Sequence, residues 1–261
     1  MTKTPKIIVA APPEYISRAK RSGCMTAQMS YRIGRGFRLY RLHRTPDTDG
    51  GLMVLDTSDY KGGGPTRSLI DDTMSECMRR DFCGIVIDSG ARPNSPSQLS
   101  LSKMLSKAAM ENGLLYFVPE SLAETGENAI VRVSTALSGG TLSRHISDAA
   151  VKYGAGRVAL EIQRVLMDFT LPALNGMGKN LSPAEFSALK ERHNASSFFS
   201  PHLAVNYFTY CDKKTAHFVL HDNAPSIRQK LLIGMHSGIE YSFLFYPQIA
   251  DIHDSLFSGE K

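Results

Sequence analysis

The feature that most constrains the fold is a regular alternation of short apolar runs with longer amphipathic segments. Several of the apolar runs are uninterrupted, which is typical of strands buried on both faces of a sheet. The strand-like runs span residues 6–10, 51–56, 83–88, 114–120, 129–134, 157–162 and 241–246. Segments of helical periodicity lie between most of them, and three of these end at a glycine that can cap a helix, namely Gly113, Gly154 and Gly238. Strands that alternate with helices predict a parallel sheet.

The chain length turns this alternation into a specific expectation. One further strand within residues 25–42 would bring the count to eight, and eight strands that close on themselves form a (β/α)8 TIM barrel, for which 261 residues suffice. The sequence contains no internal repeat and no low-complexity linker. We therefore predict one TIM-barrel domain over residues 1–261.

Residues 163–222 depart from the alternation. Ser182, Pro183 and Glu185 form the capping box of a helix, with proline in the first turn. The stretch "NYFTYCDKKTAHFVLHD" then places two apolar runs around "CDKK", which indicates a β-hairpin. We predict that residues 163–222 are an insertion with a helix and a β-hairpin between the last two strands. Such an insertion would wall one side of a cleft at the C-terminal face of the barrel.

Composition excludes several classes of protein. Hydrophobic residues make up 42% and charged residues 21% of the chain, which is ordinary for a globular protein, and no run of 18 apolar residues predicts a membrane span. The cysteines lack CxxC spacing, which argues against a zinc site and suits a reducing compartment, so we expect a cytoplasmic protein. His217 and His221 share a predicted strand face without a third ligand in view. We expect no metal and no cofactor.

Positive charge is concentrated in one segment. Residues 18–44 contain eight lysines and arginines and no acidic residue, whereas the whole chain has a net charge of +5. This segment could bind an anionic polymer, or it could be a solvated surface. We do not expect nucleic acid as a partner.

Ordered features of the chain from residue 83 to residue 246 resemble a known family. The stretch "YFTYCDKKTAHFVLHDNAPSIRQKLLIGMHSGIEYSFLFY" is similar to the tyrosine-rich hairpin, the acidic turn, the helix and the last strand of chitinase-type glycoside hydrolases (family 18), in particular their spore-cortex and germination branch. "RVALEIQRVLMDF" resembles the strand before the family's insertion, and "GIVIDSG" stands where the family has its acidic strand.

The resemblance implies a catalytic motif that this chain has mostly lost. The family pattern DxxDxDxE falls on Cys83, Val86, Asp88 and Gly90. In the family, the final glutamate is the general acid, and the preceding aspartate orients the acetamido group of the substrate, which acts as the nucleophile. Only Asp88 keeps its carboxylate, and Gly90 cannot donate a proton.

Two further family features are also missing. The family's Tyr-Asp pair on the sixth strand, which holds the acetamide, falls near Thr135 and Ala136, and the tryptophan of the last strand is replaced near Phe245 in a chain without tryptophan. General acid catalysis contributes roughly 10²- to 10⁴-fold in rate. We therefore predict that the family mechanism does not operate, and that the cleft binds a glycan that contains N-acetylglucosamine, such as a peptidoglycan fragment, or a protein partner.

Two alternatives remain open. Carboxylates at other strand ends could replace the lost acid and make an active hydrolase, because barrel enzymes carry their chemistry at that face. Alternatively, the basic segment 18–44 could be the functional part. The candidate catalytic residues are Asp88, Glu120 and Glu161. The candidate ligand-binding residues are Asp56, Asp168, Tyr210, Phe245 and Tyr246.

Overall fold

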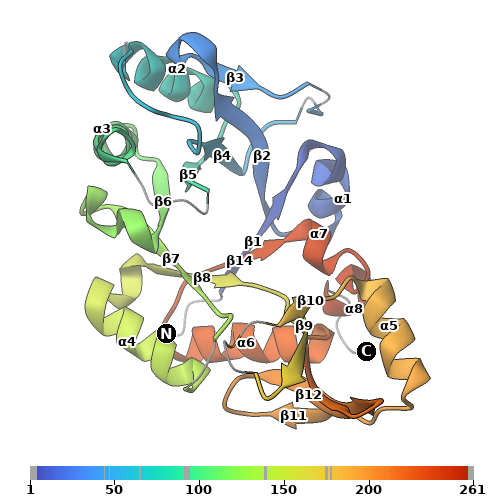
Figure 1. Ribbon diagram of the computed structural model, residues 1–261. Helices are drawn as coiled ribbons and strands as arrows, with labels where there is room; N and C mark the ends of the chain where they lie inside the picture. The colour runs from blue at the N-terminus through green and yellow to red at the C-terminus, as the bar shows by residue number, and fades with distance from the viewer. Residues whose placement is uncertain are drawn as a thin grey trace.

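The computed structural model describes residues 5–257, apart from residues 44, 47, 65, 91–94, 138–139, 174–175 and 177 and the side chain of residue 35. Its main element is a nine-stranded sheet in the order β1-β14-β8-β7-β6-β5-β4-β2-β3 (Figure 1). β3 (Leu39–Arg41) pairs with β2 in antiparallel orientation, and the other strands of this sheet pair in parallel. Because β1 also pairs with β2, the eight parallel strands close into a (β/α)8 TIM barrel, as predicted. These strands are β1 (Lys6–Ala11), β2 (Met25–Ile33), β4 (Leu52–Asp56), β5 (Gly84–Asp88), β6 (Leu115–Pro119), β7 (Ala129–Ser134), β8 (Val158–Ile162) and β14 (Tyr241–Phe245).

The strands are apolar on both faces because the barrel has two packed layers. One layer fills the interior and takes side chains from each of the eight parallel strands, namely Ile8, Ala27, Leu52, Val54, Val86, Phe117, Ile130, Ala159, Tyr241 and Phe243. The other layer joins the outer strand faces to the helices. Alternate residues of a strand point to opposite faces, so each strand must supply apolar side chains to both layers.

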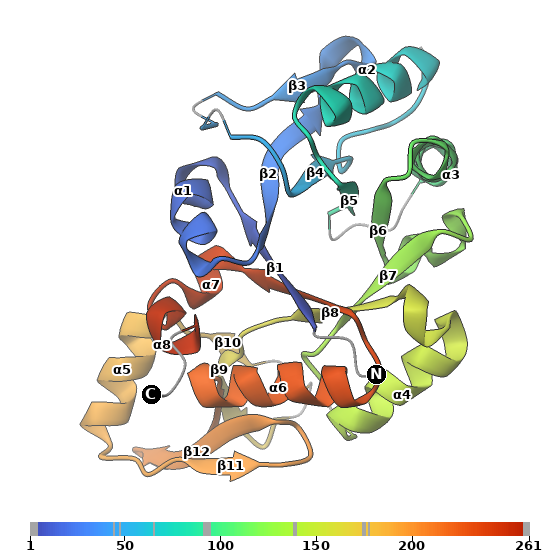
Figure 2. The ribbon, with the colours of Figure 1, turned by 180° about the vertical axis from the view of Figure 1, so that it is seen from behind.

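Helices surround the barrel and end largely where the sequence indicates (Figures 1 and 2). Gly113 and Gly154, which follow α3 and α4, have φ of 67° and 88°, a region that favours glycine. The helices are α1 (Ile16–Ala19), α2 (Thr66–Arg79), α3 (Pro96–Glu111), α4 (Leu142–Tyr153), α5 (Pro183–Arg192), α6 (Ala224–His236), α7 (Tyr246–Ile249) and α8 (His253–Phe257).

The insertion lies between β8 and β14, as predicted, and it contains more strands than the one expected hairpin. Its sheet has five antiparallel strands in the order β10-β9-β13-β12-β11. They are β9 (Leu166–Leu171), β10 (Lys179–Asn180), β11 (Phe198–Ser200), β12 (Val205–Asp212) and β13 (Thr215–His221). The hairpin around "CDKK" is β12–β13, and the capping box of α5 forms at Ser182 and Glu185.

The basic segment is divided between two ends of the barrel. Lys20 and Arg21 lie in the short 3-10 helix η2 (Lys20–Ser22), before β2 begins. Arg32 and Arg38 lie at and beyond the other end of β2. The nine residues of β2 separate the two groups by on the order of 25 Å, so the described basic side chains form no single patch.

Candidate functional site

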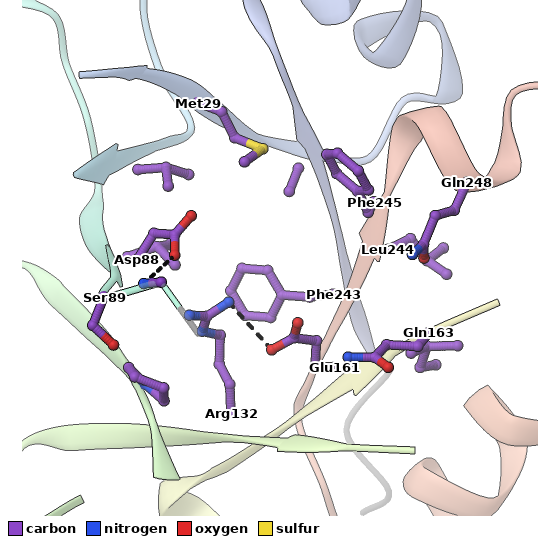
Figure 3. Close-up of a pocket in the computed structure, with 16 residues that line it drawn as sticks. Met29, Asp88, Ser89, Arg132, Glu161, Gln163, Phe243, Leu244, Phe245 and Gln248 are labelled. Carbon is purple, nitrogen blue, oxygen red and sulfur yellow. Dashed lines mark hydrogen bonds and ion pairs between the residues drawn. The ribbon is translucent and has the colours of Figure 1, made fainter. Parts of the chain in front are cut away.

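A cavity of about 330 Å³ opens at the C-terminal ends of the barrel strands (Figure 3). Barrel proteins hold their ligands and catalytic groups at this face. The polar side chains that line it are Asp88, Ser89, Arg132, Glu161, Gln163 and Gln248. Its apolar wall includes Met29, Phe243, Leu244 and Phe245. Three of the residues predicted from the sequence, Asp88, Glu161 and Phe245, therefore lie together.

Asp88 is the last residue of β5, the fourth strand of the barrel, and lies above Val86 on the inner face. Its Oδ1 accepts a hydrogen bond from the backbone N–H of Gly90 at 3.0 Å. Gly90 has φ of 70°, in the left-handed region, and a Cβ at this position would lie 3.1 Å from the Cβ of Ser58. The backbone here suits glycine, and the position where the resemblance expects a general acid carries no side chain.

Arg132 of β7 occupies the floor of the cavity between Asp88 and Glu161 (Figure 3). Its guanidinium group donates to the carbonyl oxygen of Ile87 at 2.7 Å and to Glu161 Oε2 at 3.3 Å, and it lies 5.8 Å from the centre of the Phe243 ring. Its Nε atom is buried and has no hydrogen-bond partner among the residues that the structure describes. Sequence reasoning missed Arg132, although a single arginine within the apolar run "AIVRVS" was a visible signal.

Glu161 of β8 faces Arg132 from the seventh strand, and its side chain is 38% exposed. Oε2 holds the ion pair with Arg132. A carboxylate in such a pair is a hydrogen-bond acceptor, so the pair suits binding or a general base better than proton donation.

Two predicted acids at strand ends do not line this cavity. Glu120 begins the 3-10 helix η4 (Glu120–Thr125), and its carboxylate accepts a hydrogen bond from the Tyr153 hydroxyl at 3.3 Å. The chain turns outward after Pro119, which still lines the cavity, so Glu120 points toward α4 instead. Asp56 lies in register with Asp88 on the neighbouring strand, but its Oδ1 accepts from the backbone N–H of Ser58 at 2.9 Å in the loop above.

The remaining ligand-binding candidates lie elsewhere. Asp168 is in β9 of the insertion, where it accepts a hydrogen bond from the Tyr210 hydroxyl at 2.7 Å and pairs with His217 at 3.0 Å. Burial and the Asp168 carboxylate raise the pKa of Tyr210. The last strand ends one residue earlier than expected, so Tyr246 is the first residue of α7. Its buried ring packs against Tyr15 and His253. These three residues form structural contacts and do not line the cavity.

The sixth strand offers no substitute for the family's Tyr-Asp pair. Thr135 is buried, and its backbone N–H donates to the carbonyl oxygen of Glu161 at 3.0 Å. Ala136 follows it without a polar side chain. Neither of these two residues places a phenol hydroxyl or a carboxylate at this point.

Neither a metal centre nor a membrane span emerges from the described part of the chain. No cluster of three or more histidine, cysteine or acidic side chains there has a geometry that could hold a metal ion. Among the described helices, none is both long enough and apolar enough to cross a membrane.

Comparison with known proteins places the fold. No protein-family model matches the sequence, and no curated protein sequence matches it. The spore cortex-lytic enzyme SleL of Bacillus megaterium is similar in structure, with a TM-score of 0.66 and 16% identity over 99% of this chain and 75% of that chain. A chitinase from Chromobacterium violaceum has a TM-score of 0.67 and 14% identity over 97% of this chain and 99% of that chain. A GH18 chitinase from Cycas revoluta, solved with (GlcNAc)4, has a TM-score of 0.63 and 14% identity over 96% of this chain and 98% of that chain. The chain therefore has a TIM barrel like that of family 18 glycoside hydrolases.

Proposed function

We propose that this protein binds a glycan that contains N-acetylglucosamine in the cavity at the C-terminal face of the barrel, without hydrolysing it by the mechanism of family 18. The observation that carries the proposal is the backbone of Gly90, which stands where the resemblance expects a general acid and has a conformation that favours glycine. Asp88 remains beside it as a hydrogen-bonding group.

The rest of the cavity supports sugar binding. Phe245 offers an aromatic ring at the rim, while Gln163 and Gln248 offer amide groups that can bond hydroxyls. Ligand sites commonly combine an apolar wall with a few convergent polar groups in this way. The structural likeness to chitinases, to a chitinase solved with (GlcNAc)4 and to a cortex-lytic enzyme favours chitin-like or peptidoglycan fragments as the ligand class.

The test joins a hydrolysis assay to a binding titration. Chitin oligomers and muropeptides are incubated with the protein, products are separated by chromatography, and the same ligands are titrated by calorimetry. Binding without products supports the proposal. The absence of any binding refutes it, and it would direct the search to a protein partner.

A second candidate is an active hydrolase that uses Asp88 and Glu161. The observation that favours it is that both carboxylates line one cavity, as two-carboxylate hydrolysis requires. Turnover that disappears in Asp88→Asn or Glu161→Gln, and persists in Glu120→Gln, would establish this alternative. Glu120→Gln is a matched control because Glu120 lies outside the cavity.

The third hypothesis, binding of an anionic polymer by residues 18–44, has less structural support, because the described basic residues of this segment lie at two ends of the barrel. It stays testable through the salt dependence of binding to an acidic polysaccharide.

A further inference from the structure

The charged groups of the cavity differ in how many hydrogen bonds and ion pairs they already make. Its described lining contains two carboxylates, Asp88 and Glu161, and one guanidinium, Arg132. Arg132 is committed to Glu161 Oε2 and to the carbonyl oxygen of Ile87. The lining therefore has one negative charge more than it has positive charges.

Carboxylate oxygens are left for a ligand, beside the amide groups of Gln163 and Gln248. Asp88 Oδ1 accepts from Gly90, and Oδ2 takes no hydrogen bond from any described residue. Glu161 Oε1 is likewise without a donor within the described part of the chain, and the Glu161 side chain is 38% exposed. In Figure 3 the two carboxylates lie on opposite sides of Arg132.

A neutral ligand that covers these carboxylate oxygens would lose binding free energy. Displacing water from a carboxylate without supplying a counter-charge is unfavourable, and a protonated amine offsets that cost with charge-assisted hydrogen bonds. An acetamide group offers one N–H donor and adds a carbonyl oxygen, which needs a donor of its own. Arg132 Nε is buried beneath the surface of the cavity, so that donor has to come from the amide of Gln163 or Gln248.

We propose that the cavity selects a hexosamine unit whose amine is free and protonated, so that a de-N-acetylated glycan binds more tightly than its N-acetylated counterpart. Ammonium groups of the bound glycan bond Asp88 and Glu161, and the sugar face lies against Phe245. This inference rests on the proposed glycan-binding function and deepens it by naming the chemical form of the sugar.

Non-specific attraction does not mimic this selectivity. The protein has a net charge of +5, so a cationic glucosamine oligomer meets overall repulsion outside the cavity. Tight binding of such an oligomer must therefore come from a local cluster of carboxylates.

The test compares glucosamine tetramer with N-acetylglucosamine tetramer by calorimetry on the wild-type protein at pH 6. We expect the free-amine tetramer to bind about 10- to 100-fold more tightly, the range that one hydrogen bond to a charged group provides. Asp88→Asn keeps the acceptor for the Gly90 N–H but removes the charge. It should lower the preference for the free-amine tetramer about 10-fold.

The outcomes separate this inference from the function on which it rests. Equal or tighter binding of the acetylated tetramer overturns the selectivity and leaves glycan binding intact. Failure of both tetramers to bind overturns both. A preference that persists in Asp88→Asn and in Glu161→Gln refutes the assignment to these carboxylates, with Glu120→Gln as the variant that should behave as wild type. If a variant fails to fold, the comparison of the two tetramers on the wild-type protein still decides the selectivity.

Discussion

Replacing Lys230 with methionine should destabilise the protein more than any change to its surface ion pairs. Lys230 of α6 donates to Asp222 Oδ2 at 2.6 Å, and the two side chains are 1% and 0% exposed. Asp222 also accepts from the backbone N–H of Val165 at 2.8 Å and from the Ser226 hydroxyl at 2.8 Å. Because Val165 comes just before β9 and Asp222 just after β13, this cluster holds both ends of the insertion's sheet to α6.

The magnitude follows from the burial of the partner that remains. Methionine has most of the volume of lysine, so Lys230→Met creates only a small void in the core. It leaves the buried Asp222 carboxylate without its counter-charge. Removing one member of a buried ion pair costs about 3–5 kcal/mol. For a chain of this size, 1 kcal/mol lowers Tm by about 2–4 °C, so the expected drop is about 6–20 °C.

Urea unfolding followed by circular dichroism measures the free energy of unfolding, and calorimetry measures Tm. Lys107→Met is the matched control, because Lys107 pairs with Glu111 at 3.8 Å and both side chains are largely exposed. Exposed pairs of this kind contribute about 0.5 kcal/mol or less. A loss below about 1 kcal/mol in Lys230→Met would refute the reasoning, since it would mean that Asp222 needs no buried counter-charge.

Three further predictions concern the site and the core. Gly90→Glu should leave chitin-oligomer hydrolysis at background, because an added acid does not by itself supply the groups that hold an acetamide. A side chain at the left-handed φ of 70° should also lower the free energy of unfolding in urea by about 1–2 kcal/mol. Measurable turnover would contradict the prediction on activity. Burial, followed by the charges of Lys190 and Arg164, lowers the pKa of His221 to about 4. The unfolded chain, with a histidine pKa near about 6.5, therefore takes up a proton that the folded chain refuses, and stability should fall by about 2–3 kcal/mol as pH drops from 7 to 4. An equal pH dependence of unfolding in His221→Gln would count against this assignment. Tyr116→Phe removes a buried hydroxyl 2.8 Å from Ser102 Oγ and should cost about 1–2 kcal/mol, whereas an unchanged urea midpoint would show that the hydrogen bond contributes nothing.

The sequence was sufficient to predict the barrel because its strands are buried on both faces and therefore stand out as apolar runs. The run 129–134 was predicted with the bounds that β7 has in the structure. The outer strands of the insertion were not predicted, because β10 and β11 are short and mostly exposed and carry no continuous apolar signal. Strands at the edge of a small sheet depend on pairing with neighbours far along the chain, which a local pattern does not reveal.

The residues that line the cavity could have been predicted from the alternation of side chains along each strand, and not from the positions of the strand ends alone. Side chains on one strand face recur every second residue, so an inward apolar residue fixes which later residue faces the cavity. The interior residues Val86, Ile130 and Ala159 are each followed two positions later by a cavity residue, respectively Asp88, Arg132 and Glu161. The same count from interior Phe117 reaches Pro119 and bypasses Glu120.

Extended by one step on β5, the count from Asp88 reaches Gly90, which also lines the cavity. The position where the resemblance expects a general acid therefore lies inside the cavity and carries no side chain. Two and three strands further around the barrel, at β7 and β8, the inward residues form the Arg132–Glu161 ion pair. With glycine at one inward position and a paired arginine at another, the described lining presents carboxylate acceptors. That combination is the physical basis for expecting a cavity that retains a sugar and leaves its glycosidic bond intact.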